Sequence, residues 1–152
     1  MVKKVVKVAG VQSNPTILEK EKNLEECLES IKIASKEGAE LVVFPECSLT
    51  GYCFSSLEEA LSVAESIPGP SVEAVASLCK ELGVFVVIGL VERDGDGCFN
   101  SIALLGPEGF VGKYRKLHLP YLGVDRFAFH GDLPLEVFNT GVGEIGMNIC
   151  FD

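Results

Sequence analysis

Three residues of this chain have side chains suited to nucleophilic catalysis: Glu46, Lys116 and Cys150. A cysteine attacks carbon as its thiolate, so its proton must first be removed. A carboxylate can accept that proton, and a lysine ammonium can stabilise the oxyanion that forms at a carbonyl. Each of the three residues lies at or just beyond the end of an expected strand, where α/β sheets place their sites. The pattern therefore favours attack of a cysteine thiolate on a carbonyl group.

The first part of the chain predicts a strand–helix–strand unit. Residues 5–12 are short, apolar and β-branched, which is typical of a buried strand. Apolar residues at helical spacing predict a helix over 17–37, ended by Gly38. A second buried strand is expected over 41–44, before Pro45. This order implies a parallel strand pair with a helical crossover, and it places Glu46 at the carboxyl end of a strand.

The remaining elements predict an α/β fold, parallel at first and mixed afterwards. Residues 84–91 are all apolar, as expected for a central strand covered on both faces. The other expected elements are a short helix over 57–66, a helix closed by Gly83, a turn over 94–97, strands over 100–105 and 110–113, a long loop over 116–134, and strands over 135–139 and 144–149. Long loops in compact domains are often functional.

Composition restricts the class of protein. The chain has 152 residues, of which 47% are hydrophobic and 23% charged, which is typical of a folded globular domain. The formal net charge of −9 argues against nucleic-acid binding and is compatible with a small neutral substrate. The longest apolar run, 84–91, is far shorter than the about 20 residues of a membrane span. With no leader sequence apparent, we expect a cytoplasmic protein that does not associate with membranes.

The six cysteines are expected to be free thiols. They form no CxxC pair and no zinc-like spacing, and a chain this rich in core residues does not need a disulfide scaffold. Cys47 is adjacent to Glu46, but its side chain is expected to point the opposite way. The cysteines expected to be buried packing residues are Cys27, Cys47, Cys53, Cys79 and Cys98.

Three segments resemble the motifs of a known family. Residues 44–52 (FPECSLTGY) resemble the glutamate motif of the nitrilase superfamily of carbon–nitrogen hydrolases. Residues 114–120 (YRKLHLP) resemble its lysine motif, and residues 146–152 (GMNICFD) its nucleophile motif. The opening VAGVQ at 8–12 is similar to the family's first strand. Because the motifs occur in the family's order, the resemblance covers essentially the whole chain.

The resemblance implies a mechanism. Glu46 would be the general base, Lys116 the cation that stabilises the intermediate, and Cys150 the nucleophile. The implied reaction is hydrolysis of a non-peptide C–N bond, in which Cys150 attacks an amide carbonyl or a nitrile carbon and forms a thioester. An amidase is favoured over a nitrilase, and neither a metal nor an organic cofactor is expected. The backbone N–H of Phe151 is a candidate second oxyanion donor.

The resemblance has two departures. The family often carries a second glutamate between the lysine and the cysteine; here Asp125 lies nearest the expected place. Tyr52 and Phe151 are further candidates for substrate binding, although packing would explain each equally well. The implied fold is an α-β-β-α sandwich, of which residues 1–152 would form about the first half, stopping after the nucleophile motif. A homodimer or larger homo-oligomer is also implied by resemblance.

Three alternatives stay open. The chain would be an inactive fragment or a binding module if it kept the motifs without a working catalytic assembly. A Cys–His nucleophilic pair using His118 or His130 would leave Glu46 and Lys116 without a role. In the alternative that we favour, the enzyme is intact and the rest of the polypeptide is another chain or lies outside this sequence.

Overall fold

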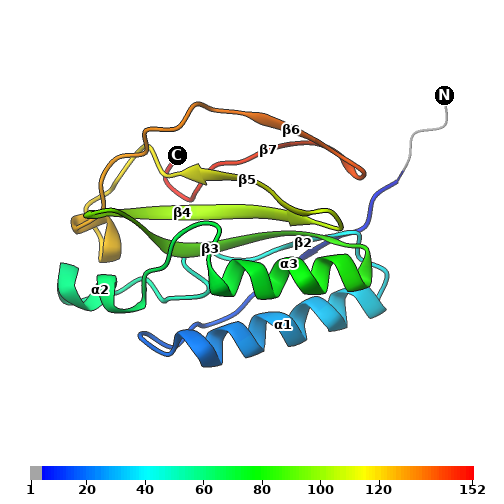
Figure 1. Ribbon diagram of the computed structural model, residues 1–152, viewed down its shortest axis with the longest axis horizontal. Helices are drawn as coiled ribbons and strands as arrows, with labels where there is room; N and C mark the ends of the chain where they lie inside the picture. Colours follow the sequence, from blue (N-terminus) through cyan, green and yellow to red (C-terminus); the bar gives the residue numbers. More distant parts are fainter. Residues whose placement is uncertain (1–4) are drawn as a thin grey trace.

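The computed structural model describes residues 5–152, and its centre is a five-stranded sheet (Figure 1). The strands lie in chain order: β1 (Val8–Gly10), β2 (Leu41–Val43), β3 (Phe85–Asp94), β4 (Gly97–Gly106) and β5 (Gly109–Arg115). The first three strands are parallel, and β3, β4 and β5 pair antiparallel. The predicted change from parallel to mixed pairing is confirmed, as is the central position of β3.

Helices cover one face of this sheet. Helices α1 (Lys20–Lys36) and α3 (Pro70–Leu82) pack side by side below it in Figure 1, and the short α2 (Leu57–Val63) lies beyond one end of α3. Ile31 of α1, Val75 of α3 and Ile88 of β3 are fully buried in the core that they share. The helix predicted over 17–37 begins later, at Lys20, because the backbone turns at Leu18, where φ is +66°.

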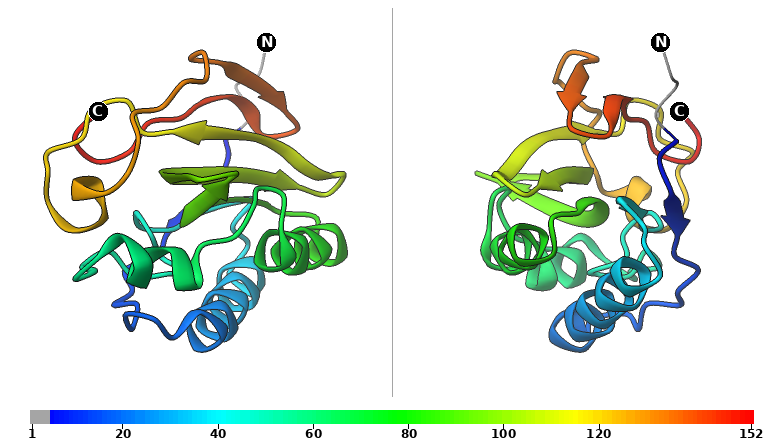
Figure 2. Two further views of the ribbon diagram at one scale, coloured as in Figure 1. Left: turned by 60° about the vertical axis from the view of Figure 1, so that its left-hand side comes forward. Right: turned by 90° about the vertical axis from the view of Figure 1, so that its right-hand side faces the viewer.

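The opposite face carries a separate β-hairpin of β6 (Val137–Thr140) and β7 (Gly143–Gly146) (Figure 2). The sequence predicted a strand over 144–149, so that strand's predicted end is wrong: it stops at Gly146. Residues 149–152 form a turn instead, in which Asp152 N donates to the Ile149 carbonyl at 3.0 Å. Cys150 therefore lies in a turn beyond the strand.

A buried ion cluster lies on the helix-facing side of β3, β4 and β5. Glu92 follows the inward-facing Ile88 and Leu90 at the two-residue period of a strand. Its carboxylate accepts hydrogen bonds from Arg115 Nη2 at 2.6 Å and from Ser101 Oγ at 2.7 Å, and it pairs with Lys113. Burial opposes charge on Glu92, but these bonds outweigh it and lower the carboxyl pKa. The ion pairs of Glu92 with Lys113 and Arg115 therefore link β3 to β5 across β4.

We expect Glu92→Gln to lower the free energy of unfolding by about 3 kcal/mol at pH 7, because Arg115 and Lys113 lose their buried counter-charge. The folded-state pKa of Glu92 lies below the ordinary value of 4.5. The ionised Glu92 carboxylate therefore stabilises the fold fully above pH 4.5, and this contribution is lost as the pH falls through the folded-state pKa. Urea unfolding at several pH values measures this. An equal difference between parent and variant at pH 7 and pH 3 would contradict it.

Within residues 5–152, no helix is long and apolar enough to span a membrane.

Candidate active site

Close backbone packing at Gly89 positions Glu46. The segment after β2 lies against β3 so tightly that a Cβ on Gly89 would come within 2.6 Å of Cys47 N and 2.7 Å of Pro45 O. Leu49 N donates to the Gly89 carbonyl at 3.0 Å, and Cys47 adopts a left-handed backbone with φ of +52°. A residue without a side chain is therefore required at position 89, and the turn holds Glu46 at the carboxyl end of β2.

The alternation of β5 selects Lys116 over its neighbour Arg115. Lys116 N donates to the Asn100 carbonyl at 2.9 Å, so strand pairing continues one residue past β5. Successive side chains point to opposite faces of a strand. Arg115 faces the helix side, where it binds Glu92, and Lys116 lies on the other face, beside Asn100. The sheet therefore presents Lys116 to the same side as Glu46.

Four side chains form a closed ring of hydrogen bonds. Lys116 Nζ lies 2.6 Å from Glu46 Oε1 and 2.7 Å from Asp125 Oδ2. Asn100 Nδ2 donates to Glu46 Oε1 at 2.6 Å and to Asp125 Oδ1 at 2.8 Å. We call Glu46, Asn100, Lys116 and Asp125 the carboxylate–lysine cluster. Tyr52 adds a hydrogen bond from its hydroxyl to Asp125 Oδ2 at 3.0 Å.

The cluster keeps its lysine charged. The Lys116 side chain is 0% exposed, and burial works to lower the pKa of its ammonium group. Hydrogen bonds to Asp125 and Glu46, together with their negative charges, outweigh burial and raise that pKa. Lys116 therefore remains an ammonium ion that two carboxylates share.

Cys150 reaches the cluster from the turn over 149–152. Its thiol lies beside Glu46, and its backbone has a left-handed φ of +46°. Burial and the negative charge of Glu46 raise the pKa of the thiol, whereas the charge of Lys116 works to lower it. Glu46 is therefore the carboxylate placed to accept the proton of this thiol.

The three predicted residues meet although the strands that precede them are not neighbours. Strands β2 and β5 are separated in the main sheet, and β7 belongs to the hairpin. Asp125 comes from the long loop, where a short 3-10 helix, η1 (Gly123–Arg126), turns its side chain inward until it is 0% exposed. The hydrophobic core below the hairpin brings Ile149, and with it Cys150, towards Tyr114 of β5.

Two residues of the site were missed or misplaced by the sequence analysis. Asn100 was not considered, although its alternation on β4 puts it on the same face as Lys116. Cys47 was expected to point away, and this is wrong. Its sulfur lies 3.5 Å from Asn100 Oδ1, because the left-handed turn at Cys47 directs the side chain under Glu46. Burial raises the pKa of the Cys47 thiol well above its ordinary value.

The other expectations on cysteine and histidine have mixed outcomes. All six cysteines are free, and Cys53 is exposed, so its assignment to the core is wrong because its loop lies at the surface.

The two histidines bind groups other than the Cys150 thiol. His118 Nδ1 lies 3.1 Å from Asp152 Oδ1, and His130 Nδ1 lies 2.8 Å from the Leu117 carbonyl. Phe151, a candidate for substrate binding, is an exposed residue. Over residues 5–152, no group of His, Cys, Asp and Glu could hold a metal ion.

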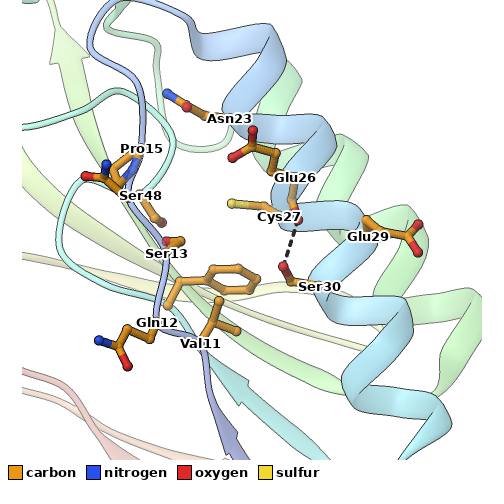
Figure 3. A pocket seen from close by; sticks show the side chains of 12 residues that line it. Val11, Gln12, Ser13, Pro15, Asn23, Glu26, Cys27, Glu29, Ser30 and Ser48 are labelled. Carbon is orange, nitrogen blue, oxygen red and sulfur yellow. Dashed lines mark hydrogen bonds between the residues drawn. The ribbon is translucent and has the colours of Figure 1, made fainter.

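Two pockets flank the segment over 11–17. One, of about 530 Å³, reaches Glu46 and Tyr52 and is lined also by Pro15 and Ile17. The other, of about 350 Å³, lies between this segment and α1 (Figure 3). Polar side chains that line the second pocket already have protein partners: Asn23 Nδ2 donates to the Thr16 carbonyl at 2.8 Å, and Ser48 Oγ donates to the Gly89 carbonyl at 3.2 Å. Of these two pockets, only the first is lined by Glu46 of the cluster and by Tyr52.

The carboxylate–lysine cluster thus lies on the sheet face opposite the helices, together with the turn that carries Cys150. The chain belongs to the carbon-nitrogen hydrolase family, which residues 7–152 match. The family predicted from the three motifs is thereby confirmed.

Individual relatives agree with this assignment. The chain is 47% identical to a nitrilase of Pyrococcus abyssi over 97% of its own length and 56% of the relative's. It is 34% identical to the omega-amidase NIT2 of Xenopus tropicalis over 88% of its own length and 50% of the relative's. The chain thus spans about half the length of these curated relatives.

Solved structures share the fold. A CN-hydrolase superfamily protein from Xanthomonas campestris has a TM-score of 0.82 at 21% identity, over 96% of this chain and 53% of that chain. Nit3 of Saccharomyces cerevisiae has a TM-score of 0.77 at 25% identity, over 96% of this chain and 55% of that chain. The predicted α/β fold, as about the first half of the nitrilase-like sandwich, is confirmed.

Proposed function

We propose that the protein hydrolyses small non-peptide amides through a thioester on Cys150. The observation that carries this proposal is that Glu46 binds the buried Lys116 ammonium at 2.6 Å and also interacts with the Cys150 thiol. In the first step, Glu46 takes the thiol proton as sulfur attacks the carbonyl carbon. The Lys116 ammonium and the backbone N–H of Phe151 stabilise the oxyanion. The C–N bond then breaks, and protonated Glu46 gives its proton to the departing ammonia or amine.

The second half of the reaction regenerates the enzyme. Glu46 accepts a proton from water, whose oxygen attacks the thioester carbonyl. The C–S bond breaks, the carboxylic acid leaves, and the proton returns to Cys150. Asp125 keeps Lys116 in place and shares its charge, which is the role we propose for it instead of a second glutamate. Tyr52 in turn holds Asp125 and lines the pocket that approaches Glu46.

We favour an amide over a nitrile because an amide already has the carbonyl group that the proposed cycle uses. In both halves of the cycle Glu46 acts as the base, and Lys116 is the cation beside the carbonyl oxygen. The relatives themselves include a protein named nitrilase and one named omega-amidase. Ammonia release from a panel of small amides, with the corresponding nitriles in parallel, tests the choice. Turnover of nitriles alone would reject the amidase proposal, and binding without any turnover would support a binding module.

Glu46→Gln is expected to reduce kcat by at least about 100-fold, because the amide cannot accept a proton from the thiol or from water. The variant keeps a hydrogen-bond acceptor for Lys116, and Asp125 remains as its counter-charge, so the melting temperature should fall less than that of Lys116→Met. Steady-state ammonia release and thermal unfolding measure the two effects. Glu108→Gln, in an exposed turn, is the matched control and should retain parent activity. A Glu46→Gln protein with parent kcat would remove Glu46 as the base.

The family resemblance also leads us to propose a cytoplasmic homodimer or larger homo-oligomer. Light scattering of the purified protein measures the oligomeric state, and a monomer at micromolar concentration would reject it.

A further inference from the structure

The Asp152 carboxylate connects the two segments that carry Cys150 and Lys116. Its side chain is 5% exposed, although it lies at the end of the described chain. Oδ1 accepts hydrogen bonds from the backbone N–H of Leu117 at 3.1 Å and of His118 at 2.9 Å. Oδ2 accepts from the Tyr114 hydroxyl at 2.9 Å and from the backbone N–H of Ile149 at 3.1 Å. One carboxylate thus binds residues on both sides of Lys116 and a residue next to Cys150.

This connection is needed because no strand pairing provides it. The hairpin that precedes Cys150 forms its own sheet, and β5 ends just before Lys116. Figures 1 and 2 show the C-terminal end of the described chain beside the end of β5. Besides the Asp152 bonds, the two segments share an apolar cluster that includes Ile149 and Met147 on one side and Tyr114 and Leu117 on the other. The left-handed backbone of Cys150 also needs support, since few residues other than glycine adopt it without cost.

We propose that Asp152 is a positioning residue, which holds the turn of Cys150 against the Lys116 segment so that the thiol stays beside Glu46 and Lys116. The proposal rests on the proposed function for its effect on turnover. Asp152 touches neither the thiol nor the cluster through any hydrogen bond described above, so it acts through Ile149 and through residues 114–118. The carboxylate is suited to this role because all of its partners are hydrogen-bond donors. Burial would raise its pKa, but the bonds from His118, Tyr114 and Ile149 outweigh burial and lower it.

Asp152→Asn is the direct test, because asparagine has the same shape but replaces one acceptor oxygen with a donor that would face other donors. We expect kcat for amide hydrolysis to fall at least 10-fold, with KM changed less than 2-fold, because the reacting groups are displaced while the substrate pocket is kept. A purely structural role would change the melting temperature without this split between kcat and KM. Glu144→Gln, which removes a charge from an exposed position of β7, is the control and should keep both constants.

A second readout does not depend on turnover. Iodoacetamide alkylates exposed thiols, and Cys53 and Cys150 are the exposed cysteines of the chain. We expect Asp152→Asn to raise the alkylation rate of Cys150 relative to Cys53 at least 3-fold at pH 8, because a thiol that leaves the site escapes the burial and the Glu46 charge that raise its pKa. Peptide mass mapping over time gives both rates in one sample.

The outcomes separate the two proposals. If the parent protein turns over amides and Asp152→Asn leaves kcat and the Cys150:Cys53 ratio unchanged, the positioning role is wrong and the proposed function stands. If no amide or nitrile is hydrolysed but the ratio rises, the proposed function is wrong and the positioning role stands. Should Asp152→Asn fail to fold, Tyr114→Phe removes one bond to Oδ2 and is expected to lower kcat about 2- to 3-fold and to raise the ratio about 2- to 3-fold. Unchanged values in that variant would also overturn the positioning role.

Discussion

Replacing Cys150 with alanine is expected to abolish hydrolysis of every substrate, with kcat reduced at least about 10³-fold. No other cysteine can take over the reaction. Cys47 is the next thiol by position, but it is buried beneath the cluster and burial raises its pKa. Cys150 lies in an exposed turn, so the alanine variant should keep the melting temperature of the parent within a few degrees.

The measurement combines turnover with trapping of the intermediate. Intact mass after rapid acid quench should show an acyl adduct on the parent protein and none on Cys150→Ala. Cys79→Ala, which removes a thiol from the helix-facing core, is the matched control and should retain kcat. Turnover by Cys150→Ala within 10-fold of the parent, or an adduct mapped to another residue, would contradict the proposed nucleophile.

Replacing Lys116 with methionine is expected to be nearly as damaging to turnover and more damaging to stability. The variant leaves Glu46 and Asp125 without the cation that both of them bind. Removing one partner from a buried ionic cluster typically costs about 3–5 kcal/mol of folding free energy. The oxyanion also loses its positive partner, and we expect kcat to fall at least about 10³-fold.

Two comparison variants separate catalysis from stability. Lys113→Met removes a lysine of β5, three residues before Lys116, whose side chain lies on the opposite face and binds Glu92. It should lower stability and leave kcat within about 3-fold of the parent. Lys116→Arg keeps the charge in a larger, planar group, so it should be more stable than Lys116→Met but should still lose turnover. Urea unfolding measures the stability of each variant, and ammonia release measures its turnover. Equal losses of kcat in Lys113→Met and Lys116→Met would assign Lys116 a purely structural role.

The order and type of the main elements could be predicted because they depend on local patterns. Continuous apolar β-branched segments, helical spacing and the glycines at 38 and 83 led to correct strands and helices, and the Asp94–Gly97 turn indeed joins β3 to β4. Boundaries were less accurate: the strand predicted over 144–149 ends at Gly146, since the hydrogen-bonded turn over 149–152 replaces its last residues.

The sequence by itself determined which residue types are available for chemistry and the family to which they belong. The motifs around Glu46, Lys116 and Cys150 were sufficient for the family, because motif order does not depend on which strands are neighbours. Asp125 was found in the same way, as the nearest carboxylate to an expected position.

Only the tertiary structure decided which of these groups touch. Strand alternation sends Arg115 to Glu92 and Lys116 to the cluster, and it adds Asn100, which no motif had indicated. The left-handed turn at Cys47 places a thiol beneath Glu46 where a simple alternation would have turned it away. Contacts such as these join residues far apart in the chain, and they depend on register, on close approach at Gly89 and on burial. None of those properties can be deduced from the spacing of the residues along the sequence.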